Sequence, residues 1–159
     1  MKLELERYED RHADALWAML EPMLRAGETY CLPVDLDRAG ALAYWCGPTH
    51  ETWIAGDDLG TYYLRPNQQG NGDHVCNAGF VTAPGAAGRG VARTMLEHAL
   101  KRARDRGFAA MQFNFVVASN ARALQIWDDY GFDIVGRVPQ AFRHPRLGPT
   151  DALILHRTL

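Results

Sequence analysis

Two asparagines fall in segments that otherwise have the composition of β-strands. Asn77 lies within Val75–Val81, and Asn114 lies within Ala109–Val117. Asparagine is depleted in strands, and a buried amide without a partner costs about 1–3 kcal/mol. Each amide is therefore expected to bind something. Asn114 is predicted either to bind backbone where two strands splay apart or to face a reacting group, and Asn77 is a second candidate for that group.

A glycine-rich turn, Gly88-Arg89-Gly90, lies between a predicted strand and a predicted helix. Glycines allow a ligand to approach the backbone, and a helix start offers unpaired N–H groups to a pyrophosphate. Val91-Ala92 follows where a P-loop has Lys and Ser or Thr, which argues against a nucleoside triphosphatase. No acidic residue ends a following strand, so a Rossmann dinucleotide site is a poor match.

Weaker candidates lie in the predicted loops. His74 precedes Asn77 and could act as a base, while Tyr30 lies in a loop that could shape a substrate pocket. Arg143, in an Arg-His-Pro-Arg run, could bind a carboxylate or could be solvated. No cluster of His, Cys, Asp and Glu has metal-ligand spacing, so no metal site is predicted.

Alternating strands and helices must position these residues. Apolar alternation or helical periodicity predicts strands at 2–8, 51–56, 61–66, 75–81, 109–117, 132–138 and 152–156, and helices starting near 13, 38, 91 and 121. Met111, Phe113, Phe115 and Val117 are expected to share one face of their strand. A loop is expected between the last two strands.

The whole-chain properties exclude several classes of protein. A chain of 159 residues predicts a single domain spanning 1–159. The net charge of −2 argues against the basic surface that general nucleic-acid binding needs. No apolar run is long enough to span a membrane. Three cysteines without a C-x-x-C pair, and no signal peptide, predict a reducing, cytoplasmic location.

Two linked motifs resemble those of the GNAT superfamily of N-acetyltransferases. They are Pro84…Gly88-Arg89-Gly90-Val91-Ala92 and Asn120-x-x-Ala123…Gly131-Phe132. The blocks Asn77-Ala78-Gly79-Phe80, Gln112-Phe113-Asn114-Phe115-Val116 and Ile126-Trp127 are similar, more narrowly, to fungal azetidine-2-carboxylate acetyltransferases and their bacterial relatives.

The resemblance implies a fold and a donor site. The fold is α/β, with a mixed, mostly antiparallel sheet, helices on both faces and splayed central strands that hold the acyl-CoA. The backbone from Ala87 through Gly88, Arg89, Gly90, Val91 and Ala92 to Arg93 would bind the diphosphate of acetyl-CoA. The strand residues Phe80, Val81 and Thr82, together with Asn120 and Trp127, would line the rest of the cofactor.

Two residues depart from the family pattern. Ala87 stands where the family usually has Gln or Arg, and Trp127 stands where it often has a tyrosine acid. Trp cannot protonate a departing thiolate, so the general acid stays unassigned. A backbone N–H near Phe80 or Val81 is expected to stabilise the oxyanion.

The resemblance implies an acetyl-CoA-dependent transfer to a small amine, such as an amino or cyclic imino acid. Asn77 and Asn114 are its expected catalytic residues, and they are joined by Tyr30 and Arg143 as substrate contacts. Open alternatives are a protein N-terminus, a polyamine, an aminoglycoside, or an acyl-CoA-binding protein without catalysis. The C-terminal segment ALILHRTL would suit edge pairing in a homodimer.

Overall fold

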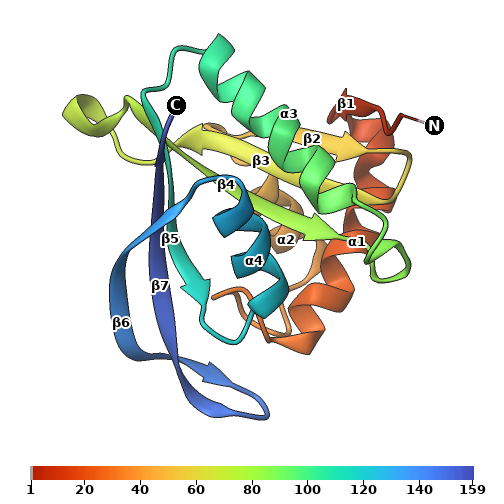
Figure 1. Cartoon of the computed structure of the whole chain (residues 1–159). Coiled ribbons are helices and arrows are strands. Elements are labelled where there is room, and N and C mark those ends of the chain that lie inside the picture. Colours follow the sequence, from red (N-terminus) through yellow and green to blue (C-terminus); the bar gives the residue numbers. More distant parts are fainter. Residues whose placement is uncertain (1) are drawn as a thin grey trace.

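The strands join into one seven-stranded sheet with the order β1-β2-β3-β4-β5-β7-β6 (Figure 1). The computed structural model describes residues 2–159. The strands are β1 (Leu5–Arg7), β2 (Glu51–Ala55), β3 (Gly60–Pro66), β4 (Val75–Thr82), β5 (Ala110–Val117), β6 (Asp133–His144) and β7 (Gly148–Thr158). Every neighbouring pair is antiparallel except β4 and β5, which are parallel.

Helices cover both faces of this sheet. They are α1 (Ala13–Ala26), α2 (Arg38–Trp45), α3 (Val91–Asp105) and α4 (Ala121–Asp129), with α1 and α2 on one face and α3 and α4 on the other (Figure 1). Side chains alternate accordingly on β3, where Tyr63 joins the α1–α2 core and Tyr62 joins the α3 core. The predicted mixed α/β architecture is confirmed. Within residues 2–159, no helix is long and apolar enough to cross a membrane.

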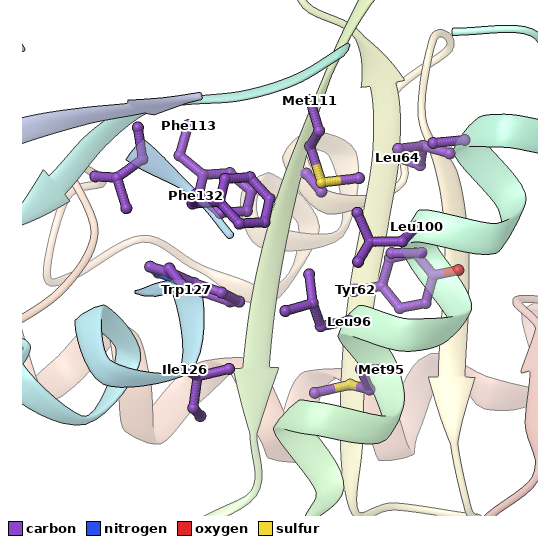
Figure 2. Close-up of a cluster of buried hydrophobic side chains, with 14 of the residues drawn as sticks. Tyr62, Leu64, Met95, Leu96, Leu100, Met111, Phe113, Ile126, Trp127 and Phe132 are labelled. Carbon is purple, nitrogen blue, oxygen red and sulfur yellow. The ribbon is translucent and has the colours of Figure 1, made fainter. Parts of the chain in front are cut away.

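The core under α3 and α4 follows the predicted helical stripe. Leu96 and Leu100 of α3 are buried beside Tyr62, and Phe113 stacks on Phe132 at a centroid distance of 4.6 Å (Figure 2). Trp127 of α4 lies 4.8 Å from Phe113 and closes that aromatic group. This core fixes α4 against the sheet beside the ends of β4 and β5.

The strands β4 and β5 pair over a short distance and then separate. Within the described residues their register partners are Val75 with Ala110 and Cys76 with Met111. A bulge in β5 between Phe113 and Val116 shifts the alternation beyond this point. Phe115, predicted to share a face with Met111, Phe113 and Val117, is therefore 37% exposed, while Val116 is buried.

The C-terminal strands are longer than predicted. The residues expected to form a loop, Arg143 and His144 among them, continue β6 until His144 pairs with Gly148. The first half of β6 was predicted as the strand 132–138, whereas the exposed stretch that follows shows no apolar alternation that could be recognised in the sequence. Segment 152–159 lies in or directly after β7, between β5 and β6, so the free edge at this side is β6 and not the predicted segment.

Candidate active site

A cavity of about 450 Å³ lies where β4 and β5 separate, and we refer to it as the β4–β5 cavity. Its walls come from β3, β4, β5, α4, α2 and the end of α1 with the loop that follows it. The predicted site residues that line it are Tyr30, Asn77, Phe80, Val81, Thr82, Ala92, Asn114, Asn120 and Trp127. The fold thus brings together residues that are up to 97 positions apart in the sequence.

The edge of β4 that faces this cavity carries backbone groups without a strand partner. The carbonyl of His74 accepts a hydrogen bond from the N–H of Ala109, on the β5 side, and the N–H of Ala83 donates to the β3 side. Successive residues of a strand direct their backbone groups to opposite edges. The groups of Ala78, Phe80 and Thr82 therefore point into the opening. Val81 contributes its side chain to the cavity, whereas its backbone faces β3.

Tyr30 reaches into the opening from the loop between α1 and α2. Its hydroxyl accepts a hydrogen bond from the N–H of Phe80 at 2.9 Å and donates one to the carbonyl of Phe80 at 3.1 Å. Burial raises the pKa of Tyr30 above its usual value, so the hydroxyl keeps its proton. The N–H expected to stabilise an oxyanion is thus held by a tyrosine hydroxyl.

The two strand asparagines have different surroundings. Asn77 is 6% exposed, and its Nδ2 donates to the carbonyl of Gln112 at 3.0 Å, which connects β4 to β5 at the point of separation. The Nε of Arg65 donates to its Oδ1 at 3.1 Å. Asn114 is exposed and bonds to the side chains of Gln112 and Asn67. The connection between splayed strands, considered for Asn114, is made by Asn77.

The glycine turn borders a second cavity of about 630 Å³, the glycine-turn cavity. Its lining includes Ala87, Gly88, Gly90, Val91, Ala92 and Arg93, while Arg89 is not part of it. The first N–H groups of α3 have no acceptor within the helix. Gly88 and Gly90 have φ angles of 78° and 79°, in the left-handed region that favours glycine.

The two cavities adjoin. Thr82, Ala92, Arg122 and Ile126 line both of them, so one groove leads from the glycine turn to the gap between the strands. Asn120 lies along this groove at the start of α4, and its side chain makes no capping hydrogen bond. The groove is therefore long, with the first N–H groups of α3 at one end and backbone groups of β4 that have no strand partner along it.

Trp127 lies in both the core and the cavity wall. It is 7% exposed and lies 5.3 Å from the ring of Phe80, centroid to centroid. Tyr130, three residues further on, donates its hydroxyl to Glu97 on α3 and is not part of the cavity lining. Neither residue supplies a proton donor to the β4–β5 cavity.

The lining also includes residues that the sequence did not predict, among them Tyr44, Tyr63 and Arg65. Tyr44 comes from α2, and the positions of Tyr63 and Arg65 depend on the register of β3 on β4, which no local motif encodes. The predicted residues Arg143 and His74 are exposed and do not line the cavity.

His50 packs behind the cavity, with its ring 4.5 Å from that of Tyr63. Burial, and next the positive charge of Arg65, lower its pKa to about 4. Its ring is therefore neutral at neutral pH, and the lowered pKa makes it a weak base. Among residues 2–159, no group of three or more His, Cys, Asp or Glu could hold a metal ion.

Comparison with known proteins gives one consistent result. The model of the acetyltransferase (GNAT) family matches residues 12–132. The structure of a GCN5-related N-acetyltransferase from Kribbella flavida has a TM-score of 0.93 and 36% identity, and covers 99% of this chain and 98% of that one.

Two further relatives are informative. N-acetyltransferase aca1 of Schizosaccharomyces pombe is 33% identical over 85 residues, which are 54% of this chain and 41% of aca1. The match thus spans less than half of that relative's length. The structure of yncA from Salmonella typhimurium, solved with acetyl-CoA, has a TM-score of 0.85 at 15% identity and covers 100% of this chain and 95% of that one. At that identity the likeness concerns the fold.

Proposed function

Because this chain belongs to the acetyltransferase (GNAT) family and is an N-acetyltransferase, we propose that it moves the acetyl group of acetyl-CoA to a small amino or cyclic imino acid, such as azetidine-2-carboxylate. The observation that carries the proposal is the continuous groove from the glycine turn to the gap between β4 and β5. An acyl-CoA needs a site for its diphosphate, a channel for its arm and a place where the thioester meets the amine.

The residues along the groove fit acetyl-CoA. The N–H groups around Gly88, Gly90 and Val91 would bind the diphosphate. The arm would pair with the open edge of β4 at Ala78 and Thr82, as an added strand does, and with Phe80 in place of the Tyr30 hydroxyl that binds its backbone. Asn120, whose side chain is free of cap bonds, would contact the arm. The structure of yncA, which has the same fold and was solved with acetyl-CoA, supports acetyl-CoA as the donor.

The reaction is a direct attack of the amine on the thioester. A C–N bond forms and the C–S bond breaks, the amine nitrogen loses a proton, and the thiolate takes one up. Once the arm of acetyl-CoA takes its place on the backbone of Phe80, the protonated hydroxyl of Tyr30 would be released to donate to the reacting carbonyl or to the departing sulfur. It would thereby replace the acid that Trp127 cannot supply. Asn114 would hold the amine or a water that accepts its proton, and Asn77 would fix the strands beside it.

The acceptor end of the cavity favours a small molecule. Arg146, at the turn between β6 and β7, donates to Glu28 at 3.2 Å and so joins that turn to the loop that carries Tyr30. The similarity to N-acetyltransferase aca1 supports N-acetyl transfer as the reaction. A protein N-terminus is the alternative acceptor.

Turnover with a panel of amines tests the proposal. The panel contains azetidine-2-carboxylate, proline, a polyamine, an aminoglycoside and an N-terminal peptide, each with acetyl-CoA, and mass spectrometry measures the acetylated product. We expect product with the amino or imino acids. Product with the peptide alone would favour the alternative acceptor. Binding of CoA by calorimetry with no product from any amine would instead favour an acyl-CoA-binding protein without catalysis.

A further inference from the structure

Arg65 is a charged side chain in the β4–β5 cavity that the proposed reaction does not use. It comes from β3, opposite Asn77 on β4. Its Nε donates to Oδ1 of Asn77 at 3.1 Å, and its guanidinium lies 5.9 Å from the ring centroid of Tyr63. Asn77 is itself fixed by its bond to the carbonyl of Gln112. The guanidinium is therefore held in one position, with both Nη atoms left for another partner.

No carboxylate of the described residues pairs with the positive charge of Arg65. Within residues 2–159 it forms no ion pair, whereas Arg93, Arg102 and Arg146 each pair with a carboxylate. The described residues that line the β4–β5 cavity include two arginines, Arg65 and Arg122, and neither Asp nor Glu. Such a wall disfavours polycationic acceptors and attracts an anion.

An anion bound by Arg65 would not be the diphosphate of the acyl donor. Asn77 and the glycine turn lie at opposite ends of β4, and the seven steps along the chain from Asn77 to Pro84 span about 20 Å. Arg122, in contrast, lies where the two cavities adjoin and is close to the donor end. Arg65 is therefore placed at the acceptor end.

We propose that Arg65 binds the carboxylate of the acceptor, and that the enzyme selects amines that carry a carboxylate close to the nitrogen. A planar guanidinium with two free Nη atoms matches a carboxylate in a bidentate pair. Its charge also disfavours the ammonium form of the acceptor nitrogen, so it supports the neutral amine that attacks the thioester. This inference rests on the proposed transfer to a small amine and defines the class of that amine.

Paired substrates test the inference. Proline and azetidine-2-carboxylate are each compared with the corresponding carboxamide, which keeps the amine and removes the charge. With the parent enzyme we expect kcat/KM to be about 10- to 100-fold higher for the carboxylates. In Arg65→Gln this ratio should fall towards one, mainly through KM of the amine, with KM of acetyl-CoA unchanged. Arg65→Lys should restore part of the ratio, because it restores the charge without the planar fork.

The control is Arg104→Gln, which removes an exposed arginine of α3 outside both cavities and should keep the parent ratio. Equal kcat/KM for carboxylate and carboxamide in the parent, or an unchanged ratio in Arg65→Gln, would overturn the inference while leaving acetyl transfer intact. Absence of product from every amine would instead count against the proposed function.

A binding measurement separates the two cases further. Calorimetry with the reaction product N-acetylproline and with N-acetylprolinamide, each added to the CoA-bound protein, needs no turnover. Preference for the carboxylate that is lost in Arg65→Gln supports the inference, and equal binding of both products contradicts it.

Discussion

Tyr30 differs from the other side chains of the β4–β5 cavity because its hydroxyl binds the backbone of β4. Replacing it with Phe removes this hydroxyl and leaves the ring. We expect Tyr30→Phe to lower kcat by about 100-fold, the usual effect of losing one general acid, and to change KM for acetyl-CoA little. Steady-state kinetics measures both. Tyr130→Phe is the matched control, since its hydroxyl binds Glu97 outside the cavity, and an unchanged kcat in Tyr30→Phe would contradict the assignment.

Substitutions of Asn77 and Asn114 should distinguish a structural role from a chemical one. Asn77→Ala leaves the carbonyl of Gln112 and the Nε of Arg65 without a partner, so urea unfolding should show a loss of about 1–3 kcal/mol. Asn114 is exposed, and Asn114→Ala should change stability by less than about 0.5 kcal/mol while reducing turnover. Near-normal turnover in Asn114→Ala would remove Asn114 from the reaction.

His50 makes the stability of the protein depend on pH. Neither ring nitrogen has a hydrogen-bond partner within residues 2–159, and burial lowers the pKa to about 4. In the unfolded chain the pKa is about 6.5, so the unfolded state binds more protons below that pH, and stability is lost as the pH falls from about 6.5 to 4. As the pH falls over this range, the free energy of unfolding of His50→Phe should decrease by about 1–2 kcal/mol less than that of the parent protein. Urea unfolding at several pH values measures it, and equal slopes would contradict it.

At the scale of the elements, the start of α3 depends on a backbone that only glycine adopts easily. Gly90→Ala forces an alanine to a φ angle of 79° and should cost about 1–2 kcal/mol, although the added methyl meets open space. It should also weaken CoA binding, measured by calorimetry, because the N–H groups of the turn shift. Gly85→Ala also meets open space but lies outside the left-handed region, and it should leave stability and CoA binding near the parent values.

Elements with strong local patterns could be predicted from the sequence. The inward stripe of α3, with Val91, Met95 and Leu100 among its members, is buried as expected. The extension of β6 could not be predicted, because an exposed edge strand needs no apolar alternation and tolerates Pro139.

The candidate site divides in the same way. The glycine turn is a local motif and was predicted directly. The contact of Tyr30 with Phe80 joins residues 50 positions apart, and the bond of Arg65 to Asn77 depends on how β3 aligns with β4. Such contacts follow from tertiary packing, which the local sequence does not determine.

At the scale of the whole molecule, the predicted homodimer would use the free edge of the sheet. Ile134, Val135 and Val138 of β6 are 57%, 60% and 44% exposed. Apolar side chains along an open strand edge favour pairing with a second copy. We expect light scattering to give twice the mass of the chain, and Val135→Lys to shift the protein towards the monomer. A monomer at all concentrations tested would contradict the prediction.

The opening between β4 and β5 divides the sheet into two blocks, β1 to β4 and β5 to β6. They are joined by two residue pairs, by the bond of Ala109 to His74 and by the amides of Asn77 and Asn114. Acetyl-CoA lying along β4 would occupy the gap between the strands and contact both blocks. Bound acetyl-CoA would then hold the two blocks of the sheet together. The molecule would be most rigid at the moment of acetyl transfer, and it would loosen each time CoA departs.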